Sequence, residues 1–159
     1  MAAPRAPGFT IIELLTVVAV IGLLLSLGVP SFNRFVIGQR VKTASFDFYA
    51  ALVFARSEAM KRRQPVTVAP VTAADWTTGW TVKQGTTLLR KQDPLIGVAI
   101  SSGAATNIVY RSDGRIVSAS NVGVLIQPNP ADSNLTNRCI RVDLAGMPRA
   151  MPITSTTCP

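Results

Sequence analysis

The chain carries one acidic residue, Glu13, inside a long apolar stretch near its N-terminus. The stretch opens with Gly8-Phe9-Thr10-Ile11-Ile12-Glu13 and stays mostly apolar as far as Val29. A charge at that depth in a bilayer costs roughly 2.5–3.5 kcal/mol or more unless it has a partner. We therefore expect Glu13 to have a function, and the chemistry open to it is ion pairing with a cation. The segment before it, residues 1–8, is short and polar and carries Arg5, which is typical of a leader peptide.

Two simpler interpretations of the apolar stretch remain open. An ordinary secretory signal peptide needs an apolar core of roughly 7–15 residues followed by a small-residue cleavage site. The stretch in this chain is longer, and Glu13 lies near the start of its apolar part. A generic single-pass membrane anchor is the second alternative.

The sequence offers little for catalysis. It has no histidine, which is the commonest general base and metal ligand. The other acidic residues are scattered, and no phosphate-binding glycine loop or nucleophile elbow is present. Two cysteines without a histidine cannot complete a structural zinc site. We therefore expect no enzymatic activity, no cofactor and no metal; a Ser–Lys dyad is the one catalytic arrangement that the sequence leaves open.

The chain is basic, with 16 Lys and Arg against 8 Asp and Glu and a formal net charge of +8. All of these residues except Arg5 and Glu13 lie after residue 30, which leaves 15 basic against 7 acidic residues there. Such a surface attracts nucleic acid, lipid headgroups or acidic proteins. Charge alone does not choose among the three.

A helix over residues 9–29 must position Glu13, because a lone span in lipid has to satisfy its own backbone hydrogen bonds. Pro30 is expected to kink this helix or interrupt it locally. Beyond it, apolar residues recur at spacings of mostly three and four, which predicts an amphipathic continuation over residues 30–63 that ends before Pro65. The apolar positions are Phe32, Phe35, Val36, Ala44, Phe48, Ala51, Leu52, Ala55 and Ala59.

Residues 64–159 are rich in Val, Thr and Ile, with Gly, Asn, Asp and Pro between the apolar runs, and this predicts strands. The Asp113-Gly114 pair, which lies between apolar residues, predicts a hairpin turn. The predicted strands are 65–71, 77–84, 86–91, 95–101, 107–111, 115–118, 122–127 and 138–144. They supply the surface that the amphipathic helix needs. The expected fold is α+β, with the second half of a long N-terminal helix packed on an antiparallel β-sheet.

The string GFTIIELLTVVAVIGLLLSLGVPSF, which begins at Gly8, closely resembles the N-terminus of type IV prepilins and type II secretion pseudopilins. The resemblance implies that a prepilin peptidase cleaves after Gly8 and that Phe9 is then N-methylated. It also implies that Glu13 pairs with the N-terminal ammonium of a neighbouring subunit during filament assembly, and that Pro30 is the family's helix-kinking proline. The expected partners are other pilin or pseudopilin subunits, the peptidase and the inner membrane.

This resemblance places Arg5 on the cytoplasmic side, in line with the positive-inside rule, and the β-sheet domain in the periplasm. The periplasm permits disulfides, so we expect Cys139 and Cys158 to be joined. The bond would hold the C-terminal tail on the strand of Cys139 and stabilise the domain by about 3 kcal/mol. Two free thiols are the alternative.

Four shorter segments resemble the FimT/FimU and GspH group of minor pilins and pseudopilins. They are the ARSEA helix segment within residues 50–59, the tryptophan strand 76–82, the Asp-Gly-Arg hairpin 112–115 and the cysteine-bearing strand 138–142. Their order favours a structural subunit that assembles into or primes a type IV pilus or a type II secretion pseudopilus. We expect Trp76 and Trp80 to be packing residues, Asp113-Gly114 to form a turn, and Arg56 and Glu58 to lie on a solvated or subunit-facing helix surface.

The alternative function is that of a receptor for double-stranded DNA in natural transformation. Some FimT-type pilins have this function, and there the resemblance implicates a Gly-Arg-x-Arg pattern near the C-terminus. The matching place in this chain reads Gly146-Met147-Pro148-Arg149, so only the second arginine matches. The candidate DNA-binding residues are Arg138, Arg141 and Arg149 near the disulfide and Arg111 and Arg115 at the hairpin.

Successive side chains of a strand point to opposite faces of the sheet, so the residues of the predicted strand 138–144 divide into two sets. Ile140, Val142 and Leu144 are expected in the core, and Arg141 and Asp143 are expected to be exposed. Arg138 falls on the inward face, so it must lie at the edge of the strand to reach solvent.

Overall fold

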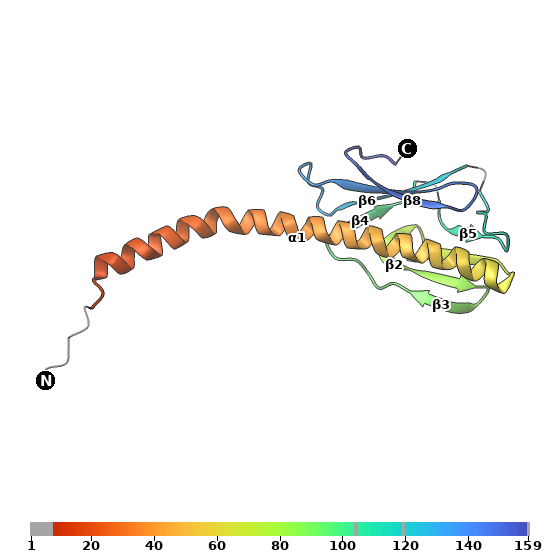
Figure 1. The fold of residues 1–159 in the computed structure, drawn as a ribbon, viewed down its shortest axis with the longest axis horizontal. Coiled ribbons are helices and arrows are strands. Elements are labelled where there is room, and N and C mark those ends of the chain that lie inside the picture. Colours follow the sequence, from red (N-terminus) through yellow and green to blue (C-terminus); the bar gives the residue numbers. More distant parts are fainter. Residues whose placement is uncertain (1–7, 104, 119, 159) are drawn as a thin grey trace, which may run out of the picture. The chain divides into compact units, whose positions relative to one another are not determined.

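The computed structural model describes residues 8–103, 105–118 and 120–158, with the backbone alone described at residues 27, 28 and 30. Residues 1–7 of the predicted leader therefore lie outside the described part. One helix, α1 (Ile11–Arg62), precedes all the strands (Figure 1). The boundary between two compact units falls inside this helix, between Val36 and Ile37. The helix is continuous through residue 30, so the local interruption considered for Pro30 does not occur.

The strands form two four-stranded sheets in which every strand pair is antiparallel. The first sheet has the order β3-β2-β1-β5 and the second the order β4-β6-β7-β8. The predicted α+β class is confirmed, but the strands divide between two sheets where a single sheet was expected. The strands of the first sheet are β1 (Val66–Thr72), β2 (Asp75–Gln84), β3 (Thr87–Lys91) and β5 (Ile108–Tyr110); those of the second are β4 (Val98–Ser101), β6 (Val122–Pro128), β7 (Asn137–Val142) and β8 (Pro148–Ile153).

One face of α1 is buried from Val41 onward. Side chains at spacings of three and four are at most 2 % exposed, and they share one hydrophobic core with residues of both sheets. They are Val41, Ala44, Phe48, Ala51, Leu52, Ala55 and Ala59. The buried face is shorter than predicted, because Phe32 and Phe35 are 65 % and 61 % exposed. Both precede Ile37, the first residue of the unit that contains the sheets.

An aromatic cluster lies at the centre of this core. Phe48 meets Trp76 and Trp80 edge to face, with ring centroids 5.3 and 5.0 Å apart, an arrangement that aromatic pairs prefer. Both tryptophans are almost fully buried, and the Trp76 indole donates a hydrogen bond to Ser102 Oγ at 2.8 Å. The predicted packing role of the two tryptophans is therefore confirmed.

Near the C-terminus, the structure corrects two further predictions. β8 was missed because it contains Pro148 and Pro152, and proline normally argues against a strand. The prolines are tolerated because β8 is the edge strand of its sheet. The chain turns after Val142, so Leu144 lies in the turn and is 39 % exposed, where a core position was expected.

The hairpin at Asp113-Gly114 is present, but the predicted strand 115–118 is not. Gly114 donates its backbone N–H to the Arg111 carbonyl at 2.9 Å, which closes the turn. Ile116 then makes only an isolated bridge with Tyr110. The turn role of Asp113-Gly114 is confirmed.

Candidate functional site

The first turn of α1 positions the carboxylate of Glu13. The Thr10 hydroxyl accepts the backbone N–H of Glu13 at 3.3 Å, so Thr10 caps a helix that begins at Ile11. Glu13 is then the third helical residue, where a carboxylate complements the positive end of the helix dipole. The Thr-x-x-Glu pattern at Thr10 and Glu13 is the sequence signal for this cap. Glu13 is exposed and makes no ion pair with any residue in the described part of the chain.

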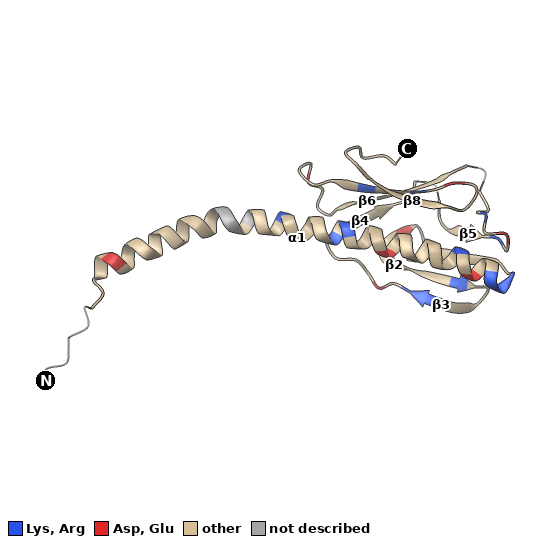
Figure 2. Cartoon of the chain, viewed as in Figure 1, with Lys and Arg blue, Asp and Glu red and all other residues tan. Residues whose placement is uncertain are grey.

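The helix that carries Glu13 presents apolar side chains to its surroundings. Phe9 is 79 % exposed, and large apolar residues of this segment such as Ile11 and Leu24 are 81 % and 64 % exposed. No other charged residue occurs in the sequence until Arg34, and Figure 2 shows the isolated acidic position near the start of α1. By length and composition this segment is able to cross a membrane.

Arg56 is a structural residue, which corrects the prediction of a solvated or subunit-facing position. Its guanidinium donates one hydrogen bond to the Gly114 carbonyl at 3.0 Å and another to the Ala145 carbonyl at 3.4 Å. The side chain is half-buried and ties α1 to the hairpin and to the turn between β7 and β8. The sequence could not place it, because both acceptors are backbone atoms remote in the chain.

Gly114 and Gly146 meet beside Arg56. A Cβ atom added to Gly146 would lie 2.0 Å from the Gly114 carbonyl oxygen, and both glycines have φ angles near +80°. Tyr110 lies against the same contact and is fully buried, with a hydroxyl that has no hydrogen-bond partner in the described chain. Burial raises the pKa of the Tyr110 phenol above its usual range, so this phenol stays neutral.

Glu58 also departs from its predicted position on a solvated or subunit-facing helix surface. It is only 9 % exposed and accepts a hydrogen bond from Arg62 one helical turn later. That hydrogen bond, with the nearby charges of Arg62 and Lys61, lowers the pKa of the Glu58 carboxyl. The pair closes the C-terminal end of α1, where Arg62 also donates to Gln84 Oε1 of β2 at 3.1 Å.

The disulfide between Cys139 and Cys158 joins the C-terminal tail to β7, as expected, with the two Cα atoms 5.4 Å apart. Cys139 is opposite Leu125 in the β6–β7 ladder, and both are buried although they face away from the core side of the sheet. The tail covers them and packs on Gly123, where an added Cβ would lie 3.1 Å from Cys158 Sγ. The disulfide therefore holds the tail over the outer face of β6 and β7, where Leu125 and Cys139 lie.

The five candidate DNA-binding arginines occupy three places. Arg141 and Arg149 are directly opposite each other in the β7–β8 ladder. Arg138 is opposite Pro152, and its odd spacing from Arg141 puts it on the face of β7 that points toward α1. Arg111 and Arg115 are exposed at the hairpin, and Arg111 lies 3.9 Å from Asp113. The three C-terminal arginines thus do not all share one face of the sheet.

The described residues contain no group of three or more His, Cys, Asp or Glu side chains able to hold a metal ion. The arrangement instead offers two surfaces for association. One is the exposed apolar helix with a single carboxylate. The other is the basic domain, in which a latch formed by Arg56, Gly114 and Gly146 joins α1, the hairpin and the β7–β8 turn. A comparison with curated protein sequences found no match. The family model described as Type II transport protein GspH matches residues 44–146, more than half of the chain.

The chain belongs to the GspH family. The matched region of this GspH-family chain includes Arg56, Gly114 and Gly146, the residues of the latch described above. Family membership confirms the prediction of a type IV pilin-like protein of the minor pilin and pseudopilin group. It implies assembly with other pilin-like subunits, and it fits a membrane-anchored pilin with an apolar N-terminal helix.

Solved structures of two proteins share the fold of this chain. The crystal structure of the type IV minor pilin FimU of Pseudomonas aeruginosa matches with a TM-score of 0.62 and 21 % identity, and the match covers 76 % of this chain and 93 % of that chain. The minor pseudopilin EpsH from the Type 2 Secretion System of Vibrio cholerae matches with a TM-score of 0.56 and 15 % identity, over 71 % of this chain and 97 % of that chain. At these identities the matches establish the fold alone.

Proposed function

We propose that this chain is a minor structural subunit that assembles into, or primes, a type IV pilus or a type II secretion pseudopilus. The observation that carries the proposal is the exposed apolar helix with its lone carboxylate, Glu13, which has no cation among the described residues. An uncompensated carboxylate in lipid is costly, so the helix is most stable where another subunit supplies a positive charge. The nearest candidate is the N-terminal ammonium of a neighbouring processed subunit.

The proposal includes the maturation that would create such an ammonium. A prepilin peptidase would cleave between Gly8 and Phe9, and Phe9 would be N-methylated and keep its positive charge. Gly8 and Phe9 precede the first residue of α1, and an added Cβ at Gly8 would meet no atom within 4 Å, so the peptide bond is sterically accessible. The helix would anchor the subunit in the inner membrane, with Pro30 near the end of the span and the two sheets in the periplasm.

The test is filament incorporation of Glu13 variants expressed in the native cell. Glu13→Ala and Glu13→Gln should leave the subunit processed and stable in the membrane but impair its recovery in sheared filaments or pseudopili. Glu13→Asp keeps the charge and serves as the matched control. Normal incorporation of the alanine variant would overturn the charge mechanism, and a shortened Gly8→Asp product would overturn cleavage after Gly8.

DNA binding is a second candidate function, and one observation favours it. Arg141 and Arg149 are directly opposite each other and share a surface hollow with one carboxylate, Asp143, so a positive charge is left there that a phosphate would offset. A few phosphate contacts would give weak, sequence-independent binding that falls steeply with salt. Binding of a DNA duplex to the full chain in neutral detergent should then weaken in Arg149→Gln, with a salt slope smaller by about one. Arg90→Gln, on the exposed strand β3, is the control, and equal effects of the two substitutions would exclude this site.

A further inference from the structure

A cavity of about 480 Å³ lies between α1 and the edge strand β8, in the range of about 300–1,000 Å³ typical of binding pockets. We call it the α1–β8 groove. Its lining mixes apolar or aromatic side chains with three basic ones, and none of its lining residues is acidic. The apolar part comprises Phe46 and Tyr49 from α1 and Pro148 and Ala150 from β8.

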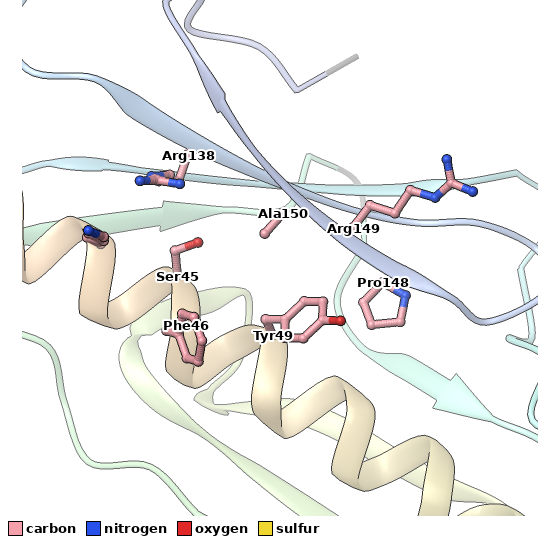
Figure 3. Close-up of a pocket in the computed structure, with 8 residues that line it drawn as sticks. Ser45, Phe46, Tyr49, Arg138, Pro148, Arg149 and Ala150 are labelled. Carbon is pink, nitrogen blue, oxygen red and sulfur yellow. The ribbon is translucent and has the colours of Figure 1, made fainter.

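The positive charges of the three basic residues in the α1–β8 groove are not neutralised by an ion pair within the described part of the chain. Lys42, Arg138 and Arg149 form no ion pair with any acidic residue that the structure describes. Figure 3 shows Arg138 and Arg149 at opposite ends of the groove, with the guanidinium of Arg149 directed away from the helix. The groove therefore attracts negative charge at its ends, while the floor between them is apolar.

Two side chains in the groove have groups that an occupant could contact. Ser45 is only 4 % exposed, and its hydroxyl makes no hydrogen bond to a residue in the described part of the chain. Phe46 is 73 % exposed at the rim, where a large apolar side chain gains little from water. In Figure 3 the Ser45 hydroxyl and the Tyr49 ring point toward the space beneath β8. An occupant with a polar group over Ser45 and an apolar group against Phe46 and Tyr49 would satisfy both.

The edge strand limits how a peptide can bind. β8 is the edge of its sheet, and Pro148 and Pro152 are two residues of the strand that lack a backbone donor. Prolines in a strand face the open edge, where they hinder the addition of another strand. Recognition in the groove therefore rests on side chains rather than on β-strand addition.

The charges also disfavour a second copy of this chain as the occupant. From Ile37 onward the sequence has 14 Lys and Arg, because Arg5 and Arg34 precede it, against 7 Asp and Glu. Two such units repel each other, whereas an acidic partner is attracted. Nucleic acid is less suited than a peptide to this groove, because an apolar floor separates its basic ends.

We propose that the α1–β8 groove docks an acidic segment of a different filament subunit, in which carboxylates flank one apolar side chain. The carboxylates lie near the basic residues at the two ends of the groove, and the apolar side chain between them packs against Tyr49 and Pro148. This inference rests on the proposed function, because the partner is another subunit of the same filament. It adds the surface and the chemistry by which the periplasmic part of that subunit is recognised.

Site-specific photo-crosslinking of the full chain in its native membrane tests the proposal. The photoreactive amino acid p-benzoylphenylalanine replaces Phe46 in the groove, Leu88 on β3 as a surface control, or Leu24 in the apolar helix as a reporter of assembly. Leu88 and Leu24 are 52 % and 64 % exposed. Position 46 is expected to give an adduct with a pilin-like subunit, mapped by mass spectrometry to a segment with at least two carboxylates. Position 88 is expected to give much less of this adduct.

The charge requirement is tested by Lys42→Glu in the position-46 background, beside Lys83→Glu as a matched control. Both lysines are exposed and form no ion pair with a described residue, so each substitution changes the net charge equally. Lys42→Glu should lower the adduct yield about fivefold or more, because the reversed charge removes an ion pair and adds repulsion, and Lys83→Glu should leave it within twofold. Exchange of an acidic residue of the mapped segment for Lys should restore the yield with Lys42→Glu.

Four results would overturn the groove proposal. These are a nuclease-sensitive adduct at position 46, a mapped segment without carboxylates, equal effects of the two lysine substitutions, and no adduct at position 46 while position 24 still crosslinks to filament subunits. If position 24 gives no subunit adduct either, the proposed function itself fails, and the docking proposal fails with it.

Discussion

Replacement of Gly146 by alanine tests the contact that joins the hairpin to the β7–β8 turn. The φ angle of Gly146 is +80°, and an added Cβ would lie 2.0 Å from the Gly114 carbonyl oxygen. No real Cβ tolerates that distance, so one backbone must move. Gly85 provides a matched control, because it also has a positive φ, +55°, but an added Cβ there meets nothing within 4 Å. The two substitutions therefore differ mainly in the backbone collision.

The expected cost is the sum of two contributions. An L-residue in the left-handed region costs about 1–2 kcal/mol, and both variants bear this cost. Overpacking of a closely packed contact costs typically about 1–3 kcal/mol, and only Gly146→Ala bears it. Movement of the Gly114 carbonyl would also weaken its hydrogen bond with Arg56. We expect Gly146→Ala to lower the free energy of unfolding by about 2–5 kcal/mol and Gly85→Ala by about 1–2 kcal/mol.

Urea denaturation of the full chain in mild detergent, followed by tryptophan fluorescence, measures this difference. Trp76 and Trp80 are almost fully buried in the core, so their emission reports unfolding of the domain. The disulfide must stay oxidised in every sample. If Gly146→Ala were no more than about 0.5 kcal/mol less stable than Gly85→Ala, the close approach of the two glycines would be refuted.

Three further predictions concern the same domain. The pKa of the Glu58 carboxyl lies below its ordinary value in the folded state. The stabilisation that ionised Glu58 provides should therefore be present above about pH 4.3 and be lost as the pH falls through the lowered pKa. Glu58→Gln should remove this dependence and flatten the acid side of the curve of unfolding free energy against pH. Reduction of the Cys139–Cys158 bond should lower the free energy of unfolding by about 3 kcal/mol in urea denaturation. Ser102→Ala should cost about 1–3 kcal/mol in the same assay, because it leaves the buried Trp76 N–H without its acceptor.

Each of these predictions has a contrary outcome. Parallel acid limbs for the wild type and Glu58→Gln would mean that the ion pair with Arg62 contributes nothing to stability. A Cys158→Ser variant should match the reduced chain, and a variant as stable as the oxidised chain would show that the tail packs without the bond. Ser102→Thr keeps a hydroxyl that can accept the Trp76 N–H. If Ser102→Ala lowered the free energy of unfolding no more than Ser102→Thr does, the hydrogen-bond argument would be contradicted.

The helix and the family could be predicted from local features of the sequence. Apolar spacing at three and four residues identified most of the buried face, from Ala44 to Ala59, because helical geometry alone fixes which residues share a face. The Asp113-Gly114 turn was equally local, since its hydrogen bond joins residues three apart. The Trp76 and Trp80 packing roles followed from their size and apolar surface.

Errors arose where a neighbouring element decides the outcome. The prolines of β8 argued against a strand until the sheet order placed that strand at an edge. Arg56 was assigned to an open surface because its acceptors, two backbone carbonyls, leave no trace in the sequence. Glu58 was likewise expected in solvent, although its partner Arg62 lies at the i+4 spacing that the sequence shows.

The sequence by itself determined the long apolar helix with Glu13, the amphipathic continuation and the pilin-like class, because each depends on spacing along a single segment. Only the tertiary structure decided that the strands form two sheets, that Arg149 lies opposite Arg141, and that Lys42 lies with Arg138 at one groove. These features depend on contacts between residues about 8 to 100 positions apart in the chain. Local backbone preference carries no information at such separations, and strand register and packing against α1 supply it.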